Sequence, residues 1–271
     1  MSDQQDAKLA QEFSKYLFGQ IDSKNYEKTK QLFRPQSVMS FEGNNCQGPD
    51  KIVGLLKQWN QKYPQTKHEA EADCLPLPDG SKLLLLTGRR MDKDHPNKMK
   101  GVLVVCAAVL KKDKNWWVSN MIYRGEANGK NCPVDSLKIG VQFAEHFYKT
   151  YDGNHRQLAQ AYSDHTIMKY EKDVCKGTQQ IMIKLTKGLS DKWEEQKKSK
   201  LPFRSVQFET VKHDLRSIDL HPAGGKGCIM IMTTGKIAPD GSQQGCAFGE
   251  VLVIHNNNGW KVAVQGFRQI Y

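Results

Sequence analysis

A short stretch at residues 41–48 returns at residues 170–177, and this repetition constrains the fold more than any other feature. In both copies an aromatic residue, a glutamate, a cysteine and a glycine follow in the same order, 129 positions apart. Further matches lie before and after the stretch in the same order, namely Phe13 with Phe143, Asp73 with Asp219, Trp116 with Trp260 and Arg124 with Arg268. A series of matches in one order indicates a tandem duplication.

The duplication predicts two compact domains of ordinary size within the 271 residues. We expect a first domain at 1–126, a linker at 127–135 that is rich in Gly, Asn and Pro, and a second domain at 136–271. The offset grows from 129 at the cysteine pair to 147 at Gly88 and Gly235. The second copy therefore carries an insertion, which we place near 190–204.

Composition is that of a globular protein, with 38% hydrophobic residues and no apolar run long enough to cross a bilayer. The first residues are polar and lack the apolar core of a signal peptide, which predicts residence in nucleus and cytoplasm and no membrane partner. The seven cysteines are odd in number and show no zinc-ligand spacing. We expect no metal or other cofactor, and we interpret Cys46 and Cys175 as small apolar filler.

Hydrophobic periodicity predicts the same order of elements in both copies. Apolar residues recur at helical spacing over 7–21 and 136–151, and shorter helices are expected at 26–33 and 154–162. A strand, a turn and a third helix follow, and each copy ends in four strand-like segments separated by turns. Helices followed by long antiparallel strands predict an α+β class, with each sheet bent around its helices.

Several motifs resemble the nuclear transport factor 2-like superfamily over nearly the whole of both halves. They are Phe41-Glu42-Gly43 with Gln47-Gly48, then Asp73-x-x-Pro76-x-Pro78-Asp79 with Gly88, and finally Trp116 through Tyr123-Arg124. The resemblance implies two cone-like domains, each a strongly bent, mostly antiparallel sheet with three helices around an apolar cavity. Members of the family dimerise through their sheet faces, so the resemblance also implies an intramolecular pseudo-dimer.

The resemblance further implies a non-catalytic protein-binding module of nucleocytoplasmic transport. In the transport member, an aromatic side chain of the small GTPase Ran in its GDP form enters the cavity, and acidic residues at the rim pair with basic residues of the GTPase. Those acidic positions carry over to Glu42, Asp92 and Asp94 in the first copy, and to Glu171 and Asp240 in the second. An alternative stays open, in which Glu42 and Glu171 are structural and pair with a neighbouring basic residue.

Two departures from the transport member widen the range of expected partners. The tryptophan with which that member grips nucleoporin repeats is replaced here by Asp6 and Ser136. The net charge is +11 and is spread evenly over both halves, whereas the transport member is acidic. Nucleoporins, Ran-GDP and an mRNA export receptor therefore all remain candidate partners, the last because relatives of this fold act as export adaptors.

Two other classes of function stay open. The even basic charge would suit an RNA-associated ribonucleoprotein scaffold, whose RNA binding would weaken steeply with salt. The same cone also hosts cavity enzymes of the ketosteroid isomerase and dehydratase type, which need a desolvated acid or histidine. Candidates for such a group are His68, Asp73, His213, Asp214 and Asp219. However, His68 has no counterpart at its offset, and Asp73 and Asp219 precede prolines as turn formers would. We therefore predict no catalytic residue.

Overall fold

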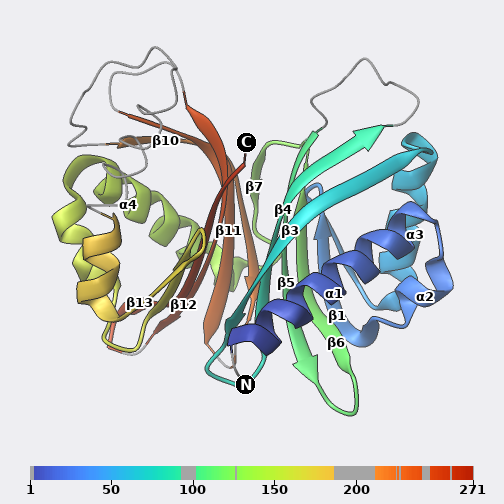
Figure 1. The fold of residues 1–271 in the computed structure, drawn as a ribbon, viewed down its shortest axis with the longest axis horizontal. Coiled ribbons are helices and arrows are strands. Elements are labelled where there is room, and N and C mark those ends of the chain that lie inside the picture. Colours follow the sequence, from blue (N-terminus) through green and yellow to red (C-terminus); the bar gives the residue numbers. More distant parts are fainter. Residues whose placement is uncertain are drawn as a thin grey trace.

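The computed structural model describes residues 3–92, 102–185, 211–239 and 245–270, apart from single positions at 126, 224, 226 and 257. Two mixed, mostly antiparallel sheets of six and seven strands stand side by side within these residues, with helices on the outer side of each (Figure 1). The α+β prediction is confirmed. The insertion expected near 190–204 lies outside the described residues.

The first sheet has the order β2-β1-β6-β5-β4-β3, in which only β1 and β6 pair in parallel. Its strands are β1 (Phe33–Phe41), β2 (Asn44–Gln47), β3 (Thr66–Pro76), β4 (Lys82–Asp92), β5 (Val102–Lys112) and β6 (Trp116–Arg124). Three helices belong to this half, α1 (Asp3–Asp22), α2 (Tyr26–Lys30) and α3 (Pro49–Lys62).

The second sheet has the order β7-β10-β11-β12-β13-β8-β9. Its strands are β7 (Gly129–Asn131), β8 (Ile167–Tyr170), β9 (Asp173–Lys176), β10 (Val211–Pro222), β11 (Cys228–Pro239), β12 (Cys246–Asn256) and β13 (Trp260–Ile270). The helical elements are η1 (Asp135–Leu137), α4 (Lys138–Asn154), η2 (His155–Ala161) and a helix over residues 177–185.

Several predicted boundaries were wrong for identifiable reasons. The second helix ends at Lys30 rather than near residue 33, because β1 already begins at Phe33. Pro35 lies inside β1 at a register shift. Proline lacks an N–H, but no hydrogen bond between the strands is lost at this position. The repeated motif is a hairpin of β1 with β2, and not a turn alone. The element at 154–162 is a 3₁₀ helix. The segment expected to be a linker contributes β7 to the second sheet.

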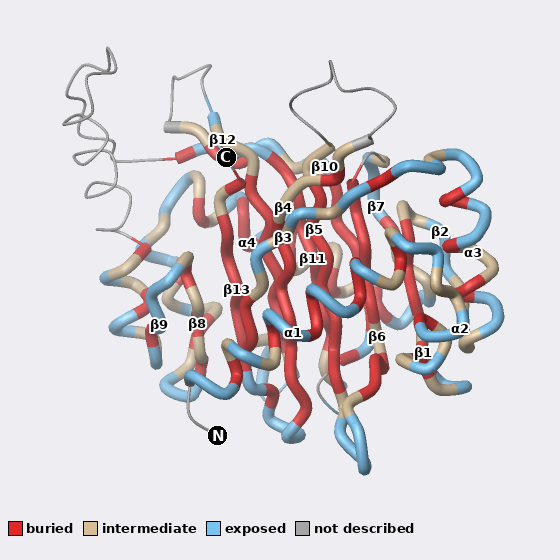
Figure 2. Tube along the Cα trace, turned by 45° about the vertical axis from the view of Figure 1, so that its right-hand side comes forward, coloured by how far each residue is buried: buried red, intermediate tan, exposed pale blue. Residues whose placement is uncertain are grey.

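Each half has its own core between the sheet and its helices. In the first, α1 places Phe13, Leu17 and Ile21 against inward-facing residues of β4 to β6. In the second, α4 places Phe147, Tyr148 and Tyr151 against β10 to β13. The amphipathic stripes predicted for the two first helices are therefore confirmed, and the buried strands run through the middle of the molecule (Figure 2).

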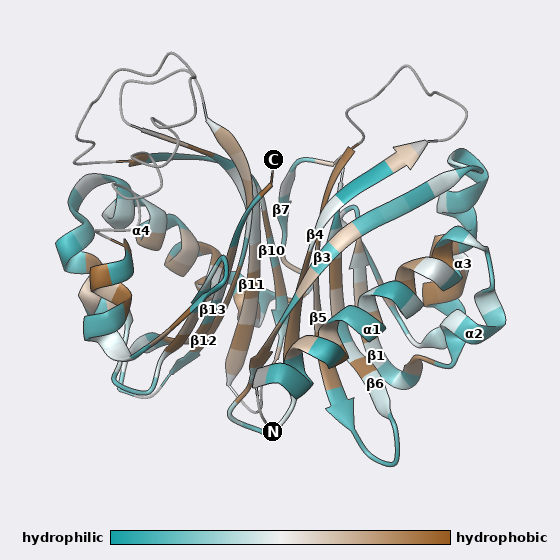
Figure 3. Ribbon diagram, viewed as in Figure 1, coloured by the Kyte–Doolittle hydropathy of each residue, from teal (hydrophilic) through white to brown (hydrophobic). Residues whose placement is uncertain are grey.

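A third apolar cluster joins the two sheets through the faces that carry no helices. Alternate residues of β4 and β5, such as Leu83, Leu85 and Val105, meet Met232 and Val251 of β11 and β12. Figure 3 shows the continuous apolar run of β5, which is almost entirely buried because both faces of the strand are covered. The two halves thus form an intramolecular pair.

Two buried ion pairs cross this interface and are related by the repeat. Arg124 Nε and Nη2 donate to the two carboxylate oxygens of Asp219 at 2.7 and 2.8 Å. Arg268 binds Asp73 in the same bidentate manner, with Nη2 2.9 Å from Oδ1. The interpretation of both aspartates as turn formers was wrong, since both lie inside strands and are buried. Their partners belong to the opposite half, where no local pattern could reveal them.

The contact between sheets is close enough to exclude a methyl group at Gly249. A Cβ there would lie 2.7 Å from Val105 Cγ2 of the other sheet. We expect Gly249→Ala to lower the free energy of unfolding by about 1–3 kcal/mol, because it overpacks the interface. The control is Gly54→Ala in α3, where a Cβ meets nothing within 4 Å and should stabilise by about 0.5–1 kcal/mol. The free energies of unfolding of both variants are measured by urea denaturation. Equal changes in the two variants would contradict close packing at Gly249.

Candidate functional site

The end of the first cone, beside the repeated motif, is open. A pocket of about 400 Å³ lies between the tip of the β1–β2 hairpin and one face of α3. Its wall is contributed by Phe41, Glu42 and Asn44 from the hairpin, by Leu55, Gln58, Trp59 and Lys62 from α3, and by Tyr63 and Ala127. The repeat motif and the third helix thus supply most of the lining.

Aromatic rings fixed by one another form the floor of this pocket. Phe41 stacks on Tyr123 with ring centroids 4.3 Å apart, and Trp59 meets Phe41 edge-on at 5.3 Å. The guanidinium of Arg90 lies 4.9 Å from the Trp59 ring and 4.6 Å from the Tyr63 ring. Stacked aromatic rings and a cation over their faces hold this geometry in place. The pocket is therefore preformed, with an apolar interior suited to a flat side chain.

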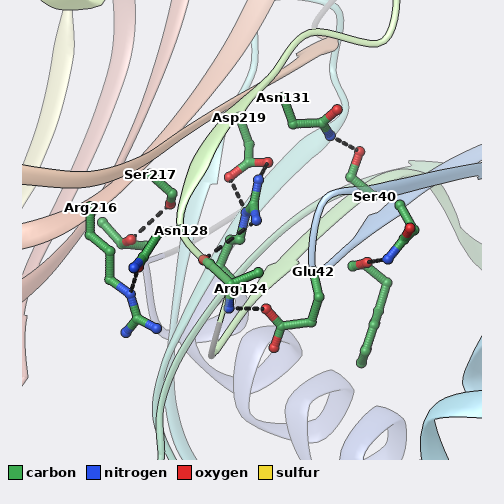
Figure 4. A network of polar contacts seen from close by, with 12 residues as sticks. Ser40, Glu42, Arg124, Asn128, Asn131, Arg216, Ser217 and Asp219 are labelled. Carbon is green, nitrogen blue, oxygen red and sulfur yellow. Dashed lines mark hydrogen bonds and ion pairs between the residues drawn. The ribbon is translucent and has the colours of Figure 1, made fainter.

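Glu42 stands at the edge of the pocket and also has a structural task. It adopts a left-handed backbone (φ 49°), and its N–H donates to the carbonyl of Tyr123 at 3.0 Å. Its half-buried carboxylate accepts the N–H of Ala127 at 2.9 Å (Figure 4). A Cβ at Gly125 would lie 2.8 Å from Glu42 Oε1, so a side chain there would displace this carboxylate. The carboxylate therefore both borders the pocket and fixes the start of the linker.

Glu171 repeats this local geometry in the second half but borders a different cavity. It too has a left-handed backbone (φ 56°), and its N–H donates to Phe267 O at 2.9 Å. Its carboxylate accepts the N–H of Gln269 at 2.6 Å, and Oε2 lies 3.7 Å from Arg268 Nη1. It lines a cleft of about 580 Å³ that also touches β3 and β4 of the first half. Glu42 and Glu171 thus do not meet in one site.

The remaining predicted rim residues are not placed. The backbone of Asp92 ends β4, but its side chain lies outside the described residues, as do Asp94 and Asp240. The acidic rims of the two copies therefore remain a prediction.

The view that the histidines lack a duplicated partner was wrong. His68 Nδ1 lies 2.6 Å from Asp22 Oδ1, and His213 Nδ1 lies 2.5 Å from Asp152 Oδ1. In each pair the backbone N–H of the histidine also donates to the aspartate. The offset between the histidines is 145, whereas that between Asp73 and Asp219 is 146. A bulge in β10 between Leu215 and Ser217 adds the extra residue, and this hid the equivalence.

The His68 dyad is part of the core. Its second ring nitrogen lies 2.9 Å from the Tyr123 hydroxyl, and its ring stacks on Phe18 at 4.6 Å. With both nitrogens engaged, His68 has no nitrogen left for a substrate. Its role is to tie the end of α1 to β3 and to β6.

The second core holds a buried acid that the sequence analysis did not single out. Glu250 is fully buried and accepts hydrogen bonds from the Tyr148 hydroxyl and, at 2.5 Å, from Gln265 Nε2. Its first-half equivalent is Cys106, in an apolar setting. The core-facing side of β12 also carries Phe248, Leu252 and Ile254. A glutamate at one of these alternating apolar positions is the sequence pattern from which a buried acid could have been predicted.

The buried carboxyl should make stability depend on pH. Burial raises the pKa of Glu250 above its usual value near 4.5, although the bonds from Tyr148 and Gln265 act against this. The folded state then holds the Glu250 proton more tightly than the unfolded state does. The contribution of the protonated carboxyl to folding stability is therefore complete at lower pH and is lost as pH rises above 4.5. Glu250→Gln should therefore gain stability relative to wild type as pH rises from 4.5 to 8. Thermal melts across that range test this, and a difference independent of pH would contradict it.

Comparison with known proteins agrees with this architecture. The family model of the nuclear transport factor 2 (NTF2) domain matches residues 139–269. Nuclear transport factor 2 of Emericella nidulans is 32% identical over 107 residues, which cover 40% of this chain and 71% of that protein. The Schizosaccharomyces pombe protein of the same name is 26% identical over 126 residues, covering 46% of this chain and 88% of its own.

Among solved structures, nuclear transport factor 2 from Cryptosporidium parvum matches 49% of this chain and 92% of its own, with 22% identity and a TM-score of 0.39. No helix among the described residues has the length and apolar character to cross a bilayer. On the match to the Emericella nidulans protein, which spans most of that relative, the chain belongs to the nuclear transport factor 2 family.

Proposed function

We propose that this chain is a non-catalytic protein-binding module of nucleocytoplasmic transport, acting in nucleus and cytoplasm, and that its first cone receives an aromatic side chain of the partner. The observation that carries the proposal is the pocket of about 400 Å³ with rings of Phe41, Trp59 and Tyr63 in its wall and Glu42 at its edge. An apolar hole supplies affinity, and a carboxylate at its rim supplies orientation. Membership of the nuclear transport factor 2 family supports the same assignment.

The proposed partner is the GDP form of Ran. A GTPase surface that presents an aromatic residue among basic groups matches an aromatic pocket with an acidic rim. Asp92 and Asp94 extend this rim in the proposal. The net charge of +11 opposes a basic partner at long range, so we expect association to speed up as salt is raised toward physiological strength. An mRNA export receptor or a nucleoporin is the expected partner if Ran is not.

The test is calorimetric titration of the chain with Ran loaded with GDP or GTP, at physiological salt. We expect micromolar binding to the GDP form and none to the GTP form. Glu42→Gln should weaken binding about tenfold, or about 1.4 kcal/mol, because it removes the rim charge but keeps an oxygen to accept the Ala127 N–H.

The proposal assigns Ran to the first cone alone. Glu171→Gln makes the same change at the equivalent position of the other half, beside a different cavity, so it is the matched control and should leave the affinity unchanged. Asp92→Asn combined with Asp94→Asn should weaken binding further. Unchanged affinity in Glu42→Gln and in the double variant would remove the acidic rim from the site. Absence of binding to either nucleotide form would reject Ran as partner.

A further inference from the structure

The linker fills a groove on the second half. Residues 129–131 form β7, which runs parallel to β10 at Ser217–Asp219 and ends that sheet. Asn128 accepts a hydrogen bond from Arg216, and Lys130 binds Glu145 of α4. Asn131 Nδ2 donates to Ser40 Oγ at 2.8 Å and to Asn45 Oδ1 at 2.9 Å, both from the first half (Figure 4).

This strap covers the outer edge of β10. Beneath it Ser217 and Ile218 are each only 2% exposed. The space that remains beside the strap is about 30 Å³, and its lining includes Arg124, Gly125, Ala127, Thr234 and Gly235. The groove on this side is thus filled by the chain itself.

The same groove exists on the first half, and no residue that the structure describes fills it. There β3 ends the sheet, and Glu71 and Ala72 take the places of Ser217 and Ile218. The Glu71 side chain is 75% exposed, and Ala72 is half-buried. The cleft here measures about 580 Å³ and is lined by residues 69–71, 87–89, 171–172 and 268–270. Thr87, Gly88 and Arg268 are the repeat equivalents of Thr234, Gly235 and Arg124 in the filled groove.

The backbone of β3 is oriented to accept another strand. The N–H of His68 points away from β4, since it donates to Asp22 Oδ2 at 2.8 Å. Alternate residues of a strand in an antiparallel pair direct their N–H and C=O to the same edge. Ala70 and Ala72 therefore direct theirs away from β4, and Ala70 also lines the cleft. None of the residues that the structure describes pairs with this edge.

We propose that the open cleft binds an extended segment of a partner protein, which adds as a strand parallel to β3 at Glu71–Asp73, as β7 adds to β10. This mode of recognition takes its affinity from main-chain hydrogen bonds and its specificity from alternate side chains. It does not depend on the function proposed for the first cone.

The differences between the two halves define the partner's chemistry. The place of Glu145, which binds Lys130 of the strap, is taken on the open side by the exposed Lys15 of α1. The central residue of the partner strand should therefore be acidic. Val174, which is 49% exposed, takes the place of Asn45 beside Asn131. The next residue of the partner strand should therefore be apolar.

Two fluorescent nonapeptides derived from residues 125–133 test the proposal, both with Cys132 changed to Ser. One is otherwise unchanged, and the other carries Lys130→Glu and Asn131→Val. Fluorescence anisotropy with the whole chain should show binding of the altered peptide, and about three- to tenfold weaker binding of the unaltered one, the effect of exchanging an attraction for a repulsion.

Three chain variants identify the site. Lys15→Glu should reverse the preference between the peptides, whereas Lys51→Glu, an equal charge change at an exposed position of α3, should leave it unchanged. Ala72→Pro should abolish binding of the altered peptide, because it removes an edge N–H while a proline with that orientation is tolerated at a sheet edge. If that variant fails to fold, the reversed peptide preference of Lys15→Glu still tests the site.

Three outcomes would overturn the proposal. They are no binding of the altered peptide at millimolar concentration, a preference that Lys15→Glu leaves unmoved, and tighter binding of the unaltered peptide. The last would mean that the groove takes the linker of a second copy of this chain. None of these outcomes depends on Ran, so failure here and failure of the proposed function are distinguishable.

Discussion

The apolar contact between the two helix-free sheet faces is the constraint on which the rest of the molecule depends. Each sheet is covered by helices on one side only, and its strands are apolar on both. Neither half could leave its second face in water without a large exposed apolar patch. The ion pairs of Arg124 with Asp219 and Arg268 with Asp73 fix the relative position of the sheets. Loss of one partner would leave a buried charge unpaired and lower the free energy of unfolding by about 3–5 kcal/mol.

Around this shared interface the two copies have diverged. Phe18 and Cys106 of the first core correspond to Tyr148 and Glu250 of the second, so an apolar pair in one copy is a hydrogen-bonded pair in the other. At the surface, Lys15 of the first copy corresponds to Glu145 of the second, and the strap residue Lys130 binds Glu145. In a homodimer every change would appear twice, whereas a fused pair lets each side acquire its own contacts. The filled and open grooves are an outcome of that freedom.

The sequence predicted the duplication and the fold class, because these rest on periodic patterns that repeat, and the family resemblance predicted the paired sheets. The sequence failed where the deciding contact was distant. Asp73 and Asp219 resembled local turn formers since each partner lies in the other half. The dyads of His68 and His213 were missed because one bulged residue in β10 changes the offset. The resemblance pointed to Glu42 as a rim acid, but its bond to Ala127 depends on where the linker runs.

The position of Arg268 in the last strand bears on how the chain is made. Its partner Asp73 precedes it by 195 residues, and β13 also contributes Val264 and Ile270 to the cluster between the sheets. Synthesis proceeds from the N-terminus, so the first half leaves the ribosome well before its covering surface exists. Until β11, β12 and β13 have emerged, Leu83, Leu85 and Val105 remain an uncovered apolar face. The nascent first domain is thus the stage at which this chain exposes the most aggregation-prone surface.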